Sequence, residues 1–170
     1  CISGGDVVDQ HRVRDGVGSV VTTMYDRTPG GELLDHGRLR GQLLDAVALH
    51  AMERALAAAG TQGGQVTGGE RTLETAHPDA YYVRPAIVEM QSQTAIVREE
   101  TFAPILYTMK YRDLEQAIAM HNDVPQGLSS CIFTTDLRGA GPCLAARGSD
   151  CGIANVNSGP SGAATAGAFG

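Results

Sequence analysis

The chain has 170 residues, 42% of them hydrophobic and 19% charged, with a formal net charge of -6. This size and composition are typical of one globular domain that can bury a core. The acidic balance disfavours nucleic acid as a partner, because such binding depends on Lys and Arg that neutralise phosphates, and no apolar run approaches the roughly 20 residues of a membrane helix.

The first part of the chain predicts helices. Residues 1–10 are Gly-rich and irregular, and apolar residues over 11–25 recur at helical spacing, which predicts a helix before the turn Thr28–Gly31. A longer helix is predicted over residues 38–59, with Gly60 as its stop. The expected apolar stripe of this helix is Leu39, Leu43, Leu44, Val47, Met52 and Leu56.

Strands then alternate with helices. A strand is predicted over residues 82–88, where Pro85 favours an edge position because it lacks a backbone donor. The other predicted strands cover residues 65–67, 105–111, 130–134 and 152–156, and helices are predicted from Asp113 to about 121 and from Asp136 to about 147. This alternation predicts an α/β fold with a mainly parallel sheet flanked by helices, in a single domain over residues 11–170.

Four sequence runs carry a family resemblance. They are Tyr82–Val88, Glu99–Leu106, His121–Ser130 and Gly148–Asn157. With them, the chain from about Leu34 onward resembles the catalytic domain of the aldehyde dehydrogenase superfamily. It is most similar to the branch that acts on lysine-derived semialdehydes, which includes α-aminoadipic semialdehyde and piperideine carboxylate dehydrogenases. The resemblance implies a truncated catalytic domain, and because the chain starts at Cys1 rather than Met, we expect residues upstream of it.

The resemblance also implies binding positions. In the family motif E-E-x-F-x-P, the second Glu bonds the nicotinamide ribose and the Phe lies beside the nicotinamide, which assigns these cofactor positions to Glu100 and Phe102. The family's substrate anchor loop, whose backbone N–H groups hold a carboxylate, falls on residues 157–164. Here Pro160 is unusual, and Ala164 stands where the branch carries Glu. The substrate-binding positions are Asn157, Ser158, Ser161, Gly162 and Ala163.

Other family features have no counterpart in these 170 residues. The coenzyme-binding βαβ units are missing, and Glu32–Asp35 replaces the E-L-G-G of the general base. Gly41–Leu44 lacks the thiol of G-Q-x-C. Oxidation of an aldehyde through a thiohemiacetal needs a thiolate, a base and a held nicotinamide. We therefore expect that this chain binds no NAD and is not a self-sufficient dehydrogenase.

Candidates for other chemistry are few. Glu99 and Glu100 are adjacent carboxylates, one of which could titrate near neutral pH, although neighbours on an extended chain point to opposite faces. His121 ends a helix, where it serves either the helix dipole or acid–base catalysis, and His36 is either a proton shuttle or part of a solvated turn.

The cysteines predict neither a metal site nor a redox motif. Cys1, Cys131, Cys143 and Cys151 form no C-x-x-C pair, which argues against structural zinc and against a dithiol. Cys131 and Cys151 are interpreted as small buried hydrophobes. A reducing cytoplasm is the expected location.

Three functions remain open. The first is a repurposed, non-redox enzyme of secondary metabolism whose amino-acid-derived substrate is free or tethered to a carrier protein. Its reaction would be attack by an amine within the substrate, giving a small nitrogen ring. The second is a fragment or remnant of an NAD-dependent semialdehyde dehydrogenase, and the third is a scaffold without catalysis. In each case we expect a homodimer or a partner subunit, because former interfaces need covering.

Overall fold

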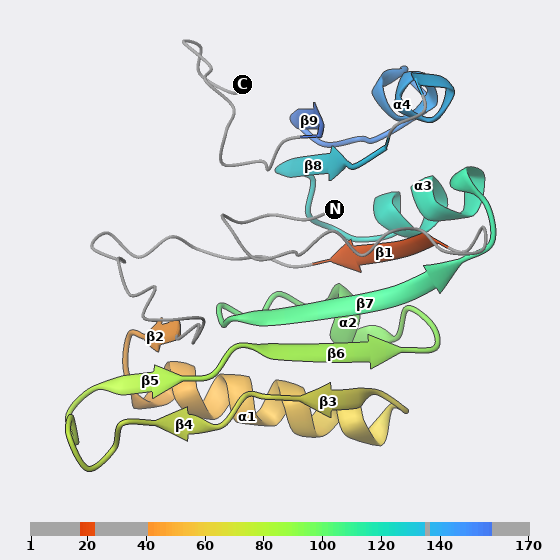
Figure 1. Ribbon diagram of the computed structural model, residues 1–170. Coiled ribbons are helices and arrows are strands. Elements are labelled where there is room, and N and C mark those ends of the chain that lie inside the picture. Colours follow the sequence, from red (N-terminus) through yellow and green to blue (C-terminus); the bar gives the residue numbers. More distant parts are fainter. Residues whose placement is uncertain (1–17, 23–40, 135–136, 158–170) are drawn as a thin grey trace, which may run out of the picture. The chain divides into compact units, whose positions relative to one another are not determined.

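The computed structural model describes residues 18–22, 41–134 and 137–157 (Figure 1). The chain divides into two compact units. One unit comprises residues 23–109, and the other comprises residues 1–22 together with 110–170. Within the described ranges, no helix is long and apolar enough to cross a membrane. A single domain over residues 11–170 stays a prediction.

The unit of residues 23–109 contains a sheet in which β7, β6 and β3 lie side by side in that order (Figure 1). Strand β3 (Gln65–Thr67) pairs antiparallel with β6 (Ala86–Met90), and β6 pairs parallel with β7 (Ile105–Tyr111). Helix α1 (Ala46–Thr61) contacts β3 and β6, and it also contacts the short helix α2 (Ala95–Arg98).

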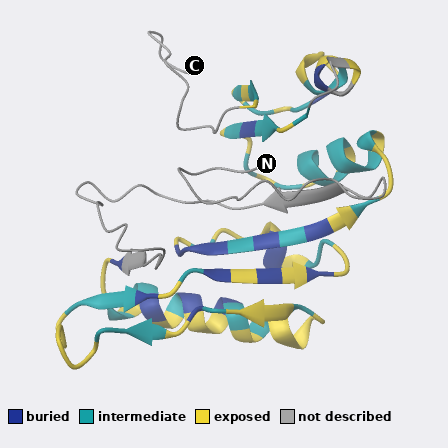
Figure 2. Cartoon of the chain, viewed as in Figure 1, coloured by how far each residue is buried: buried dark blue, intermediate teal, exposed yellow. Residues whose placement is uncertain are grey.

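The core of this unit lies on one face of the sheet (Figure 2). Along β6 every second residue is buried, and the same alternation runs through most of β7. Since alternate residues of a strand point to opposite faces, one face of these strands is buried among the described residues, while the other is exposed in β6 and half-buried in most of β7. In α1, β6 and β7 the buried residues are Leu49, Met52, Ala55 and Ala59 of α1, Ala86, Val88 and Met90 of β6, and Ile105, Tyr107 and Met109 of β7.

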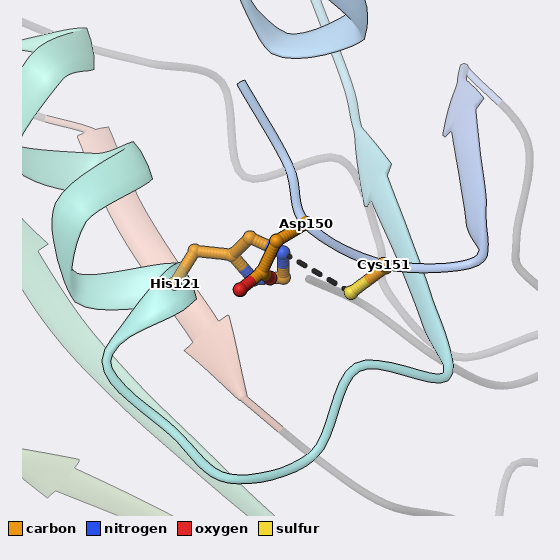
Figure 3. A group of neighbouring side chains, drawn as sticks. All are labelled: His121, Asp150 and Cys151. Atoms are coloured by element: carbon orange, nitrogen blue, oxygen red, sulfur yellow. Dashed lines mark hydrogen bonds between the residues drawn. The ribbon is translucent and has the colours of Figure 1, made fainter. Parts of the chain in front are cut away.

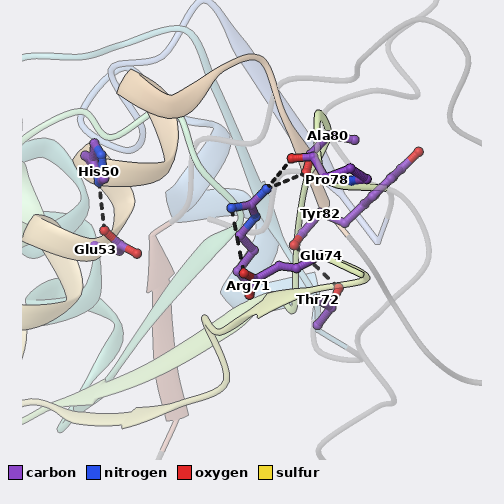
Figure 4. Close-up of polar contacts among 8 residues, drawn as sticks. All are labelled: His50, Glu53, Arg71, Thr72, Glu74, Pro78, Ala80 and Tyr82. Carbon is purple, nitrogen blue, oxygen red and sulfur yellow. Dashed lines mark hydrogen bonds and ion pairs between the residues drawn. The ribbon is translucent and has the colours of Figure 1, made fainter. Parts of the chain in front are cut away.

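A smaller sheet has the order β2 (Gly41–Leu43), β5 (Tyr81–Val83), β4 (Arg71–Thr72), with both pairings antiparallel. Arg71 stabilises the loop between β4 and β5 (Figure 4). Its Nη2 donates to the carbonyls of Pro78 and Ala80 at 2.9 and 3.1 Å, and its guanidinium lies 4.8 Å from the ring centre of Tyr81. These contacts join the start of the β4–β5 loop to its end.

Pro85 marks the point at which the chain passes from the small sheet to the large one. The predicted strand over residues 82–88 is therefore broken into β5 and β6, because proline cannot donate to a ladder. Gly68 has φ +82°, and a Cβ added to it would clash with the Pro85 carbonyl oxygen at this crossing. A side chain at this position would meet backbone, so glycine is required.

The other unit contains β1 (Gly18–Thr22), α3 (Leu114–Asn122), β8 (Ser129–Ile132), α4 (Leu137–Leu144) and β9 (Ile153–Val156). Strands β8 and β9 form a parallel pair in which Ser129 lies opposite Ile153 and Ile132 opposite Val156. Asp113 caps α3 by accepting a hydrogen bond from the Gln116 amide at 2.8 Å. This cap is expected from the sequence and is confirmed.

Two predicted helices are corrected. The helix over residues 11–25 is wrong at residues 18–22, which form a strand, since β-branched Val20, Val21 and Thr22 favour extended backbone. The helix over 38–59 starts too early. Residues 41–43 are strand β2, and Asp45 caps α1 by accepting from the Ala48 amide at 2.8 Å.

The predicted apolar stripe of this helix is also corrected. Of its described members, Met52 is buried in α1 and Leu43 is buried in β2, whereas Leu44 and Val47 are 91% and 71% exposed. The small residues Ala55 and Ala59 lie on the same face of α1 as Met52 and are buried with it, which allows the helix to approach the sheet closely.

The α/β class is confirmed, and the mainly parallel sheet is correct only in part. Pairs β6–β7 and β8–β9 are parallel, whereas pairs β3–β6, β2–β5 and β4–β5 are antiparallel. The β4–β5 connection is a hairpin, which requires antiparallel strands. Such connections are too short for the crossover that a parallel pair needs.

Candidate functional site

Polar side chains converge between the C-terminal end of α3 and the segment that leads into β9. His121 Nε2 lies 2.9 Å from Ser149 Oγ and 3.4 Å from Cys151 Sγ. Ser149 Oγ lies 2.7 Å from Ser130 Oγ, and Ser130 donates to the Ile153 carbonyl at 3.2 Å. We call His121, Ser130, Ser149, Asp150 and Cys151 the His121 cluster.

The backbone around residues 148–150 is held in place by Asn122, the last residue of α3. Its Nδ2 donates to the Gly148 carbonyl at 2.8 Å, and its Oδ1 accepts from the Asp150 amide at 3.3 Å. The Ser149 amide donates to the Cys143 carbonyl at 2.9 Å, and a Cβ added at Gly148 would clash with that same carbonyl. Fixed backbone on both sides gives the cluster a defined geometry.

Burial sets the charge state of the histidine. His121 is half-buried, and this desolvation lowers the pKa of its imidazole below the ordinary value of 6.5. The ring is therefore neutral at neutral pH, with one nitrogen that donates and one that accepts. Burial also raises the pKa of the Cys143 thiol, which lies outside the cluster.

Three groups of this cluster offer different donor atoms to one point (Figure 3). The imidazole nitrogen of His121, the carboxylate of Asp150 and the thiol of Cys151 all lie within 4.8 Å of one another. The side chains of Asp150 and Cys151 come from adjacent residues and lie beside the His121 ring at the end of α3. Asp150 is exposed, and the other two are half-buried.

The positions assigned to the cofactor lie in the other unit, between α2 and β7. Glu99 and Glu100 both have exposed side chains, and Phe102 is 66% exposed. Burial raises the pKa of the nearby Tyr107 phenol, and the negative charge of Glu99 adds to that shift. The structure places Glu99 and Glu100 on one short stretch of chain and leaves their roles as predictions.

Of the predicted substrate-binding residues, Asn157 is described. Its φ of +54° places it in the left-handed region, which asparagine tolerates. Its Nδ2 donates to the Thr134 carbonyl and its Oδ1 accepts from the Thr134 amide, both at 2.9 Å. The side chain thus closes the end of the β8–β9 pair. Ser158, Ser161, Gly162, Ala163 and His36 lie outside the described residues.

Reasoning from the sequence selects His121 and misses its neighbours. The interpretation of Cys131 and Cys151 as small buried hydrophobes is corrected, because both are half-buried and the thiol of Cys151 contacts His121. Ser130 and Ser149 carry no motif. The contacts join residues 19 to 30 positions apart, a spacing that no short motif covers. Only the paired placement of α3 and the strands β8 and β9 brings these residues together.

Solved structures define the class to which this architecture belongs. An indole-3-acetaldehyde dehydrogenase of P. syringae, in complex with NAD+ and IAA, has a TM-score of 0.62 and 31% identity over 69% of this chain and 23% of that chain. The lactaldehyde dehydrogenase of Escherichia coli has a TM-score of 0.61 and 33% identity, over 70% of this chain and 24% of that chain. The fold is therefore that of a segment of the aldehyde dehydrogenases.

The sequence comparisons identify the family. The model of the aldehyde dehydrogenase family matches residues 1–170. An aldehyde dehydrogenase family 7 member A1 of Pisum sativum is 43% identical over 150 residues, which are 88% of this chain and 29% of that protein. The α-aminoadipic semialdehyde dehydrogenase of Mus musculus is 44% identical over 147 residues, 86% of this chain and 27% of that protein. The chain belongs to the aldehyde dehydrogenase family.

The alignments cover most of this chain but only a small part of each relative. The chain spans less than a third of each of these relatives. The resemblance to the branch that acts on semialdehydes is confirmed, because one of these relatives carries such an activity in its name.

Proposed function

We propose that this sequence forms the later part of the catalytic region of an NAD(P)-dependent dehydrogenase that oxidises an amino-acid-derived semialdehyde. The observation that carries the proposal is the 44% identity to an α-aminoadipic semialdehyde dehydrogenase across 86% of the chain. This similarity supports a dehydrogenase better than the non-redox ring closure, for which it gives no specific support. We expect the protein to work in the cytoplasm.

The residues between α2 and β7 fit a nicotinamide nucleotide. A bound NAD would supply the hydride acceptor for the reaction. Glu100 presents an exposed carboxylate that can accept hydrogen bonds from two ribose hydroxyls at once. Phe102 is 66% exposed, which is unusual for a large apolar ring and suits a residue that packs against a ligand. Their role here is to bind and orient.

Adjacent carboxylates provide a matched test of this role. In the complete native protein, Glu100→Gln removes the charge that accepts from the ribose, whereas Glu99→Gln makes the same chemical change one residue earlier. A hydrogen bond to a charged group contributes about 1.5–3 kcal/mol. We therefore expect the KM for NAD to rise at least about tenfold in Glu100→Gln and to stay near the native value in Glu99→Gln.

Two measurements check the proposal. One is steady-state kinetics with α-aminoadipic semialdehyde and NAD, and the other is the intact mass of the native gene product. We expect a polypeptide several times longer than these 170 residues and NADH formation that depends on the aldehyde. A native product of this length that neither binds NAD nor forms NADH would overturn the dehydrogenase proposal. Equal KM changes in the two variants would overturn the assignment of Glu100.

A further inference from the structure

We propose that His121, Asp150 and Cys151 form a binding site for Zn2+. The site lies in the unit that contains α3, β8 and β9, and it uses none of the residues assigned to the nicotinamide or the anchor loop. It therefore stands or falls independently of the proposed dehydrogenase function. Among the side chains that the structure describes, this is the one group of three His, Cys, Asp or Glu residues close enough to share an ion.

The donor set suits zinc. Imidazole nitrogen, thiolate sulfur and carboxylate oxygen are the three ligand types that Zn2+ takes in proteins, at about 2.0–2.1, 2.3 and 2.0–2.2 Å. A site with a thiolate and an imidazole favours Zn2+ over Mg2+ and Ca2+, which prefer oxygen ligands alone. Three protein ligands leave a fourth position for water or for the hydroxyl of Ser149.

The distances also suit a tetrahedral ion. Two ligands held at zinc bond lengths around a tetrahedral centre stand roughly 3.6 Å apart. Cys151 Sγ and His121 Nε2 are separated by 3.4 Å, so this pair already has the right spacing. The Asp150 carboxylate lies within 4.8 Å of both and is exposed, so a side-chain rotation can bring it closer (Figure 3).

The scaffold around the ligands is fixed before any ion arrives. Asn122 bonds the backbone on both sides of Ser149, through the Gly148 carbonyl and the Asp150 amide. Ser130 Oγ lies 2.7 Å from Ser149 Oγ, and the Ser149 hydroxyl gives up its 2.9 Å contact with His121 Nε2 when that nitrogen binds the ion. Outer contacts of this kind orient metal ligands and are worth about 10- to 100-fold in metal affinity.

Exchange of a proton for the ion completes the chemistry. On binding, the Cys151 thiol releases its proton to solvent and its sulfur bonds the metal, while His121 binds through the lone pair of a neutral ring nitrogen. No oxidation or reduction takes place. Because Asp150 is exposed, its carboxylate is accessible to the hydrated ion.

The test is titration of the full, reduced, metal-free chain with Zn2+ alone, followed by calorimetry, and with Co2+ as a spectroscopic substitute. We expect one equivalent to bind, and Co2+ to show a thiolate charge-transfer band. Cys151→Ser and Asp150→Asn should weaken Zn2+ binding at least about tenfold. Cys143→Ser is the matched control, because Cys143 is also a half-buried free thiol, but it lies outside the cluster.

Each outcome supports or overturns the proposal. Binding that weakens in Cys151→Ser and Asp150→Asn but persists in Cys143→Ser supports the site. Absence of a thiolate band in the Co2+ complex of the native chain overturns it, as does unchanged affinity in Cys151→Ser. Circular dichroism monitors folding. If Cys151→Ser does not fold, two other measurements test the site. They are the Zn2+ affinity of Asp150→Asn, which changes an exposed side chain, and the Co2+ spectrum of the native chain.

Discussion

Asp113 shows how one side chain can set both the start and the acid stability of a helix. Its carboxylate accepts hydrogen bonds from the Gln116 amide at 2.8 Å and from Arg112 Nε at 3.0 Å. The backbone hydrogen bond, followed by that from Arg112, lowers the pKa of this carboxyl below its ordinary value. The folded state therefore binds this proton less tightly than the unfolded chain.

A pH dependence follows from this shift. The stabilisation is fully present above the pKa of the unfolded carboxyl, about 3.9, and it is lost as the pH falls through the lower folded pKa. Asparagine also caps helices but does not titrate. In thermal unfolding measured from neutral to strongly acidic pH, Asp113→Asn should lose less stability than the native chain below about pH 4. Parallel curves for the two proteins would contradict this assignment.

At the scale of single residues, the sequence predicts what depends on near neighbours. Asp113 is predictable as a cap, because it precedes a helical pattern that continues without a break. Asp45 is missed, since apolar Leu39, Leu43 and Leu44 extend the helical pattern upstream of it. The contacts of Ser149 with Ser130 and with His121 cannot be predicted, because they depend on how α3, β8 and β9 pack.

At the scale of elements, Gly60, Gly63 and Gly68 allow the cost of a positive φ to be distinguished from the cost of a steric clash. A Cβ at Gly60, in the last turn of α1, would meet nothing within 4 Å, and the same holds for Gly63, whose φ is +88°. At Gly68 φ is +82°, and an added Cβ would also clash with the Pro85 carbonyl oxygen. An alanine would therefore meet neither problem at Gly60, a strained φ at Gly63, and both a strained φ and a steric clash at Gly68.

Alanine at each of these glycines should give a graded series. Gly60→Ala should raise the free energy of unfolding by about 0.5–1 kcal/mol, because alanine restricts the unfolded chain and favours the helix. Gly63→Ala should lower it by about 1–2 kcal/mol. Gly68→Ala should lower it by roughly 3 kcal/mol, since the strand crossing must also shift. Urea denaturation measures all three, and equal losses at Gly63 and Gly68 would rule out the steric part.

Elements with a strong local pattern are predicted correctly, and the errors have specific causes. The strand over residues 105–111 is confirmed, because its alternating apolar residues leave no other interpretation. Val20 and Val21 satisfy a helical spacing by chance, yet their branched side chains are those of a strand. At Pro85 the sequence predicts an edge position, whereas the residue marks a break between two sheets.

Over the whole molecule, several large apolar side chains remain uncovered. Ile87 on the open face of β6 is 46% exposed, and Phe102, Leu128 and Phe133 are 66%, 70% and 53% exposed. Exposed apolar side chains of this kind occur at interfaces. We propose that they are covered by further polypeptide or by a second copy, as expected from the sequence.

The isolated 170-residue chain should accordingly self-associate. Light scattering should give a mass above the 17.8 kDa of one chain, increasing with concentration. The double change Phe102→Ser with Leu128→Ser should reduce this association, because both side chains are largely exposed and apolar, whereas Gln91→Ser at an exposed polar position should not. A concentration-independent mass of 17.8 kDa would contradict the prediction.

The side-chain hydrogen bonds across β8 and β9 determine the register in which these two strands pair. These strands are parallel and joined through α4, so no tight turn sets their register, and little of their surface is deeply buried. A shift of one strand by two residues would leave each side chain on the same face of the pair. It would break the hydrogen bond from Ser130 to the Ile153 carbonyl and the one from the Thr134 amide to Asn157. The side chains of Ser130 and Asn157 thus favour one register of β8 and β9. This register also places the Cys151 thiol beside His121.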